Sequence, residues 1–359
     1  MSSDLSAVGH LRDACMRNDL AKVKRLFRHR LVDSANAAEV LEAARDPRIM
    51  LLLLENGAEP NVIPIKLVRS IDKLRLLVDF GYDVGAKGHL ILEDYADDAD
   101  TLDWLLDLGA DINRTDERRT SDGQYLYTGA TDTSLHVLNR VAARGNIKLF
   151  DHLVSRGADP HRSFALHCAS KCKDPEVSVA MVSHLLDHHK LDVYANNEDL
   201  RNFFHDPPDS GTPLTNAIYR RNLAVVKELI RRGVDPNHRY HASEAIGYHN
   251  FEEGFLPALP ILLEAGADAD EALKSAIFSS HLEAAKICLD FGADPESGLQ
   301  YAQTKHAEDE EREREDDEFH ESLGYSENED AEEERRIVRE KRGAMVKLLE
   351  NSRSASTGK

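Results

Sequence analysis

Histidine and cysteine side chains that could bind a metal ion are densest at residues 161–172. This stretch holds His161, His167, Cys168 and Cys172, with the two cysteines one helical turn apart. A structural zinc site usually has closely paired cysteines with a second ligand pair downstream. The spacing here matches no standard zinc pattern, so we predict no metal site.

Three more histidines, His184, His188 and His189, fall at the end of a segment with helical periodicity. Histidine is favourable near a helix C-terminus, where the helix dipole is negative. That position explains their presence without a ligand, and we favour this interpretation.

Motifs for catalysis are missing from the sequence. It has no Gly-rich phosphate loop, no His-Glu-x-x-His, no Gly-x-Ser-x-Gly and no dinucleotide-binding Gly-x-Gly-x-x-Gly. Its many carboxylates form no defined acid–base pair with a nucleophile. We therefore predict no catalytic residues, no cofactor and no enzyme activity.

One recurring phrase dominates the chain, most plainly Leu229-Ile-Arg-Arg-Gly-Val-Asp-Pro-Asn237. Apolar residues bury one face of a helix, and the glycine then takes the left-handed conformation that closes it. The Asp and Asn that follow suit a tight turn. Further copies end at Asn61, Val84, Asn113, His161, Asp270 and Glu296. A helix end that returns at near-fixed spacing indicates a repeat protein.

A second motif precedes the phrase at a constant distance. In Thr212-Pro-Leu-Thr215 the threonine can cap a helix and the proline fits its first turn. The spacing from the leucine of this motif to the first residue of the phrase, and from there to its glycine, is the same in three other copies. At this point the sequence resembles the ankyrin repeat family, through Thr212-Pro-Leu-Thr, Ala165-Leu-His-Cys-Ala169, Gly145-Asn146 and the Gly-Ala-Asp phrases.

The resemblance covers about residues 8–302 and recurs near 336–350. It implies an all-α fold, an ankyrin-type solenoid of about nine or ten stacked helix-turn-helix repeats with short β-turn or hairpin junctions. It also implies a non-catalytic scaffold or adaptor that binds another protein through a concave groove and junction loops. In such repeats the histidine corresponding to His167 is ordinarily structural and bonds between neighbouring repeats.

Composition bounds the function further. The net charge is −20, which argues against direct nucleic-acid binding, and 41% of the residues are hydrophobic. No apolar run is long enough to cross a bilayer, and the N-terminus does not resemble a signal peptide. Four cysteines are too few for a disulfide framework. We expect an intracellular monomer, cytoplasmic or nuclear, with no membrane association.

The repeats are irregular, and this sets the expected domain organisation. We predict an array over 1–302 with a capping repeat at about 8–35 and junction insertions at 114–130 and 194–210. An acidic insertion at 303–335 would lie inside the last repeat, 336–350 would be its closing helix, and 351–359 would be disordered. Two units, 41–53 and 65–77, are shortened. A helix should begin near Pro257–Pro260, and Trp104 is expected to pack between helices.

The junction insertions carry the residues that we predict to bind a partner. Tyrosine and arginine are typical of interaction hot spots. The candidates are Arg114, Arg118, Arg119, Tyr125, Tyr127, Phe203 and Phe204. For Phe203 and Phe204, folding back over the array is an equally good interpretation, because phenylalanine is usually buried.

An alternative function uses the acidic stretch. Residues 305–334 contain 16 acids and 3 bases and could attract a basic partner in a chaperone-like way. The basic run Arg335–Arg342 that follows resembles a nuclear-import sequence, but we favour a solvated helix face that pairs with the neighbouring acids.

Overall fold

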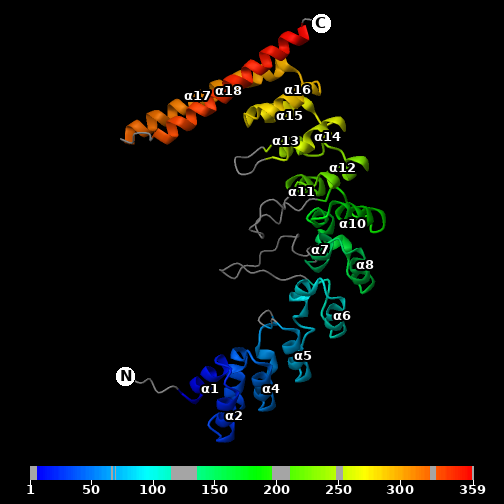
Figure 1. Cartoon of the computed structure of the whole chain (residues 1–359), viewed down its shortest axis with the longest axis vertical. Helices are drawn as coiled ribbons and strands as arrows, with labels where there is room; N and C mark the ends of the chain where they lie inside the picture. The colour runs from blue at the N-terminus through cyan, green and yellow to red at the C-terminus, as the bar shows by residue number, and fades with distance from the viewer. Residues whose placement is uncertain are drawn as a thin grey trace. The chain divides into compact units, whose positions relative to one another are not determined.

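The computed structural model describes residues 6–65, 68, 70–114, 136–195, 211–247, 254–323 and 329–357. Within these ranges the protein is all-α, with no strand. The chain divides into two compact units, which Figure 1 shows in colour order along the sequence. Unit 1 is Met1–Val141 with Lys148–Ser163, and unit 2 is Ala142–Ile147 with Phe164–Lys359.

Unit 1 begins with two regular helix pairs and then becomes irregular. Where α5 and α6 should each have a preceding first helix, only 3₁₀ turns or extended backbone are found among the described residues. The absence of a first helix from the described residues before α5 explains why the unit at 65–77 is shortened. The α-helices are α1 (Ala7–Met16), α2 (Leu20–Arg28), α3 (Ser34–Val40), α4 (Pro47–Glu55), α5 (Ile71–Asp79), α6 (Ala99–Asp107), α7 (His136–Ala143, which ends in unit 2) and α8 (Ile147–Ser155). The 3₁₀ helices include η1 (Leu41–Ala43), η2 (Pro60–Val62), η4 (Gly88–Leu90), η5 (Leu92–Tyr95) and η7 (Pro160–Arg162).

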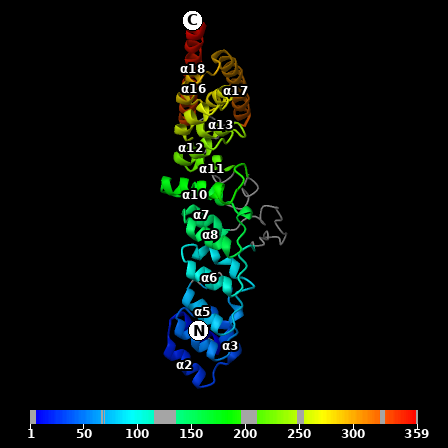
Figure 2. The same ribbon diagram turned by 90° about the vertical axis from the view of Figure 1, so that its right-hand side faces the viewer.

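Unit 2 contains two rows of helices. The first helices α9, α11, α13, α15 and α17 contact one another in sequence, and so do the second helices α10, α12, α14, α16 and α18. Figure 2 shows the same helices from the side. Their bounds are α9 (Ala165–Ala169), α10 (Pro175–Asp187), α11 (Pro213–Tyr219), α12 (Leu223–Arg231), α13 (His241–Ile246), η10 (Leu256–Ala258), α14 (Leu259–Glu264), α15 (Ala269–Phe278), α16 (Leu282–Asp290), α17 (Pro295–Leu323) and α18 (Glu329–Thr357).

The second helices end in the left-handed glycine conformation that the recurring phrase predicts. Its seven glycines have φ between 83° and 100°, and the next residue donates its backbone N–H to the carbonyl five residues back, as in Val234 N to Leu229 O at 3.2 Å. This is the bonding of a left-handed helix cap. The glycines are Gly57, Gly81, Gly109, Gly157, Gly233, Gly266 and Gly292.

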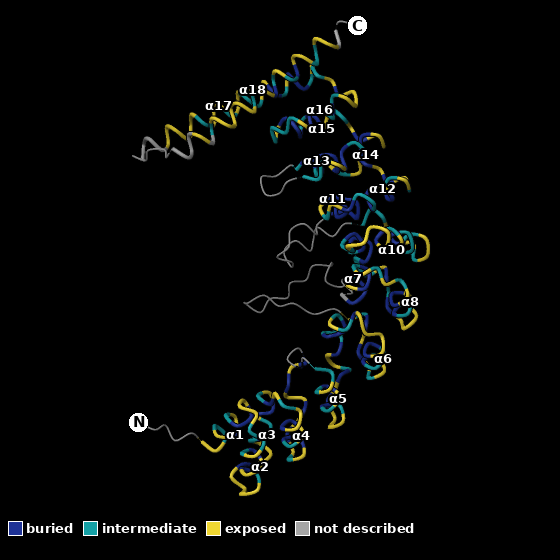
Figure 3. The backbone as a smooth tube through the Cα atoms, viewed as in Figure 1, coloured by how far each residue is buried: buried dark blue, intermediate teal, exposed yellow. Residues whose placement is uncertain are grey.

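The first helices begin as the sequence predicts where their motif is complete. The Thr212 hydroxyl accepts the Thr215 N–H at 3.2 Å, and Pro213 occupies the first turn of α11. The leucines at the two repeated positions, Leu214 and Leu229, are fully buried. Figure 3 shows buried residues on the helix faces that meet and exposed residues on the opposite faces.

Ion pairs join successive second helices on their exposed side. Arg156 contacts Asp107 at 2.6 Å within unit 1, and Arg232 contacts Asp187 at 2.7 Å within unit 2. The Arg232 guanidinium lowers the pKa of Asp187 to about 2. Each arginine directly precedes the glycine of its phrase, so repetition in sequence produces repetition of the contact.

Beneath the Arg232 ion pair lies Glu228 of α12, whose side chain is buried. It accepts hydrogen bonds from both Arg231 and Arg232 and from the Ser183 hydroxyl. The Arg231 hydrogen bond is the largest contribution that lowers the pKa of Glu228 to about 2. A buried carboxylate requires such pairing.

Several local expectations are confirmed. Helix α14 follows a 3₁₀ turn that contains Pro257, as expected from the prolines. The interval from Leu166 to Leu185, longer than the usual spacing, predicts an enlarged connection around Lys173, and α9 and α10 are indeed separated by residues 170–174, against 220–222 between α11 and α12. Trp104 is half-buried, with Arg75 of the neighbouring helix 4.5 Å above its ring, so it does pack between helices.

The C-terminal end differs from the expectation. Residues 351–357 are not disordered but form the last turns of α18, which ends at Thr357. Serine side chains there bond back to the helix, as Ser352 does to the Leu348 carbonyl at 3.0 Å. The Arg353 guanidinium also reaches Glu296 of α17 at 3.3 Å. These contacts stabilise a sequence whose composition alone suggests disorder.

None of the described helices combines the length and the apolar character needed to span a membrane.

Candidate functional site

The junctions between repeats are held by a pair of side chains with separate tasks. The acidic residue of each phrase bonds locally, as Asp235 Oδ1 accepts the Asn237 N–H at 2.8 Å. The asparagine bonds to the next repeat. Asn237 donates to the Gly266 carbonyl at 2.7 Å and accepts the Asp268 N–H at 2.8 Å. The amide therefore fastens one phrase to the phrase that follows it.

The same double contact occurs in unit 1. Asn61 bonds Gly81 O and Asp83 N, and Asn113 bonds Gly157 O and Asp159 N. Sequence reasoning assigned these asparagines to local turns and missed the bridge. The missed signal is that an amide, which both donates and accepts, recurs two residues after the acidic residue of the phrase.

A second set of cross-repeat contacts lies among the first helices of unit 2. His241 is buried; its Nδ1–H donates to the Pro236 carbonyl at 3.1 Å, and Nε2 accepts the Thr212 hydroxyl proton at 3.0 Å. Both bonds suit the neutral ring. Burial lowers the pKa of His241 to about 4.

His167 has the structural role that the family resemblance implies. It is buried, and its Nε2 lies 3.0 Å from the Ala195 carbonyl and 3.1 Å from the Gly211 carbonyl. A nitrogen that donates to backbone carbonyls is protonated and does not offer a lone pair to a metal.

The four cysteines are free thiols that differ in burial. Cys15 and Cys288 are buried, and burial raises the pKa of their thiols to about 11 and about 12. These thiols stay protonated near neutral pH and are poor nucleophiles. Cys168 and Cys172 are half-buried and reduced.

Exposed aromatic side chains mark one edge of the first-helix row in unit 2. Tyr240, directly before α13, is 78% exposed. In the adjacent junction Tyr194 packs against His238 with ring centroids 4.3 Å apart, and its hydroxyl accepts the Asp235 N–H at 3.0 Å. The junction backbone is thus fixed while Tyr240 remains open to solvent. We define the junction edge as Tyr194, His238 and Tyr240.

At the other ends of the first helices, Tyr219 of α11 and Phe278 of α15 are 37% and 44% exposed. They occupy the same repeat position, five residues after Leu214 and Leu273. The Lys305 ammonium lies 5.1 Å from the Phe278 ring centroid. This second group of aromatics is less open than Tyr240.

Of the seven predicted partner-binding residues, Arg114 lies among the described residues. Its side chain is exposed and donates to the Ala86 carbonyl at 3.2 Å, which ties two successive junctions of unit 1. The others, Arg118, Arg119, Tyr125, Tyr127, Phe203 and Phe204, fall outside the described residues, as do most of the insertions 114–130 and 194–210.

The acidic stretch is helical and forms a hairpin of α17 and α18. Figure 1 shows the two long helices side by side at the C-terminal end of unit 2. Arg335 contacts Asp317 at 2.6 Å, Arg339 contacts Glu313 at 3.0 Å, and Arg342 contacts Asp309 at 2.9 Å. This confirms that the basic run pairs with the neighbouring acids.

These contacts use the acids of α17 that face α18. A second line of acids is exposed, at positions three or four residues apart: Glu308, Glu311, Glu315 and Glu318. We call it the outer acidic stripe. Positions with this spacing lie on one face of a helix.

Residues 138–240 match the family model of ankyrin repeats, in 3 copies. The matched segment contains the junction edge and His167 with its two carbonyl partners. A search of curated proteins finds none that matches the chain.

Proposed function

We propose that this chain, an ankyrin repeat protein by its match over residues 138–240, is a non-catalytic scaffold or adaptor that binds another protein through unit 2. Ankyrin repeats are in general protein-interaction modules and typically non-catalytic. The binding face is the first-helix row together with its junction edge.

The observation that supports this proposal most is the exposure of Tyr240 on a fixed backbone. An exposed tyrosine supplies a large apolar area with a polar end, which is typical of hot spots. The backbone beside it is held by Asn237, by His241 and by the Tyr194 hydroxyl. A surface ordered before binding loses less conformational entropy when the partner arrives.

Polar residues behind this edge hold the first helices together. Thr215 donates toward Glu244 at 3.4 Å, and the hydroxyls of Ser243 and Ser275 lie 2.6 Å apart. These residues come from α11, α13 and α15, and the two serines and Thr215 are buried. Their bonds keep the row ordered beneath the exposed edge.

The test compares Tyr240→Ala with two further variants in affinity purification followed by mass spectrometry. We expect the principal partner to be lost with Tyr240→Ala, and also with Tyr125→Ala and Phe203→Ala at the predicted insertions. A hot-spot tyrosine contributes about 2 kcal/mol or more, which is roughly thirtyfold in affinity.

Each variant should keep the melting temperature of the parent protein. Lys227→Ala, at an exposed position on α12, is the matched control and should keep the partner. Retention of the partner by Tyr240→Ala would contradict the junction edge as the binding face. A product formed from a substrate by the purified chain would contradict the non-catalytic proposal.

A second candidate function follows from the outer acidic stripe. Its four glutamates have no ion pair within the described part of the chain. Exposed like charges on one helix face attract a basic partner and accelerate its encounter. The alternative is therefore a chaperone-like binding of a basic protein by α17.

Replacing the four stripe glutamates by glutamine should weaken a basic partner's binding severalfold at low salt, with little effect above about 0.5 M NaCl, where screening removes the attraction. Deleting residues 308–334 should have the same effect. The control replaces Glu42, Glu55, Glu264 and Glu283, which are exposed elsewhere. Equal weakening by the control would indicate net charge alone, and binding insensitive to salt would favour the junction edge.

A further inference from the structure

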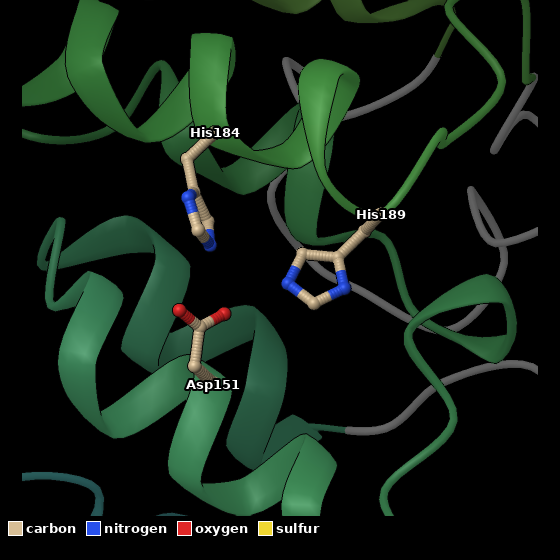
Figure 4. Close-up of side chains that lie close together, drawn as sticks. All are labelled: Asp151, His184 and His189. Atoms are coloured by element: carbon tan, nitrogen blue, oxygen red, sulfur yellow. The ribbon is translucent and has the colours of Figure 1, made fainter.

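Three histidines converge at the C-terminal end of α10. His184 is in the last turn of the helix, His188 is its C-cap residue, and His189 follows directly. The ring centroids of His184 and His188 are 4.6 Å apart, and those of His184 and His189 are 5.2 Å apart. Figure 4 shows the rings of His184 and His189 beside the end of the helix.

The sequence explains a histidine at this place by the helix dipole, but it does not predict that the rings meet. His184 and His188 are four residues apart, and His188 keeps helical backbone angles of −98° and −44°. Their side chains therefore leave the same face of α10. His189 comes from the first residue after the cap and turns back toward the same place.

The distances suit a shared ligand. A ring nitrogen of His184 and one of His189 lie within 4.8 Å of each other. Two imidazole nitrogens on a tetrahedral zinc ion, each about 2.0–2.1 Å from the metal, are separated by about 3.4 Å. Rotation about the side-chain torsions of half-buried and exposed residues can supply the difference. His188 is exposed and therefore able to rotate.

The electrostatic setting also favours a cation here. The four last carbonyls of a helix give its C-terminus a partial negative charge, and α10 is 13 residues long. On the segment that carries the three histidines, Asp187 is already engaged by Arg232 at 2.7 Å, and Lys190 opposes a cation. Within this segment the attraction therefore comes mainly from the imidazole lone pairs.

We propose that His184, His188 and His189 form a zinc-binding site in which three neutral imidazoles bind the metal and water completes the tetrahedron. Its effect would be structural. The metal would fix the end of α10 to the segment that leads through Leu191 to Tyr194 in the junction edge. Metal bound by the folded state alone stabilises that state.

The experiment titrates zinc chloride into the full-length chain by calorimetry in a non-chelating buffer. We expect one zinc ion per chain at this site. Each of H184Q, H188Q and H189Q should weaken binding at least about tenfold, and the triple variant should abolish it. Zinc should raise the melting temperature of the parent chain and leave that of the triple variant unchanged.

The matched control is H10Q/H29Q/H161Q, which also removes three histidines, all exposed, and should bind zinc as the parent does. X-ray absorption of the zinc-loaded parent chain provides a measurement independent of variant folding and should count three imidazoles. Undiminished binding by the triple variant, equal loss in the control, or fewer than two imidazoles around the metal would each overturn the proposal.

Discussion

At the scale of single residues, His241 shows how a titratable side chain becomes a structural one. Its ring is 1% exposed and bonded on both nitrogens. Protonation would force Nε2 to donate toward a hydroxyl that now donates to it. It would also place a charge in a buried position, which is why the pKa is lowered to about 4.

This predicts a loss of stability in mild acid. The unfolded chain takes up a proton on His241 near its usual pKa of about 6.5, whereas the folded chain does so only near 4. Stability contributed by the neutral ring is therefore complete above pH 7 and falls as the pH drops from 6.5 to 4. Between pH 7 and 5 the loss is about 2 kcal/mol.

The measurement is the free energy of unfolding in urea at both pH values. His241→Gln should be less stable at pH 7 but lose about 2 kcal/mol less on acidification. His29→Gln, at an exposed site, should lose as much stability between pH 7 and pH 5 as the parent chain does. The idea fails if the pH dependence of His241→Gln equals that of the parent chain.

At the scale of elements, the asparagine bridges set the register between successive helix pairs. Asn237 makes one donated and one accepted hydrogen bond to the next phrase. Both go to backbone groups at the end of α14, so the contact does not depend on the side chains present there.

Asn237→Ala should reduce the free energy of unfolding by about 1–2 kcal/mol, because two hydrogen bonds are lost at an exposed position. Asn237→Asp keeps the acceptor for the Asp268 N–H and should lose less. Chemical denaturation followed by circular dichroism measures both, with Lys227→Ala as the control. If alanine and aspartate cost the same, the donated bond to Gly266 carries the bridge.

Contacts within a repeat could be predicted from the sequence, whereas contacts between repeats could not. Gly233, Thr212 and Pro213 act on their own helices, so their types alone predicted the helix ends. The partners of Asn237, Gly266 and Asp268 of the next phrase, depend on how neighbouring repeats stack. No local pattern encodes that distance.

The acidic stretch shows the same contrast. Its charge predicts an insertion. Glu308 and Glu310 each precede an arginine by four residues, Arg312 and Arg314, a spacing that favours a continuing helix; α17 runs through this stretch to Leu323. The pairing of α17 with α18 arises between residues 18 to 33 positions apart, as in Arg335 with Asp317 and Arg342 with Asp309. Composition could not say which acids face inward and which form the outer acidic stripe.

At the scale of the whole chain, charge is distributed unevenly. Residues 305–334 carry −13 of the net −20. The arginines of α18 pair with the inner acids of α17, whereas the four glutamates of the outer acidic stripe stay exposed. The chain therefore offers two chemically distinct surfaces in unit 2, one aromatic and one acidic.

The nearest-neighbour contacts of the two helix rows have a consequence for how unit 2 forms during synthesis. The principal contacts of each helix pair are with the pair before and the pair after it. A newly synthesised helix pair can therefore pack directly on the preceding pair, which has already left the ribosome. Structure can grow in the order of translation, without waiting for a distant part of the polypeptide.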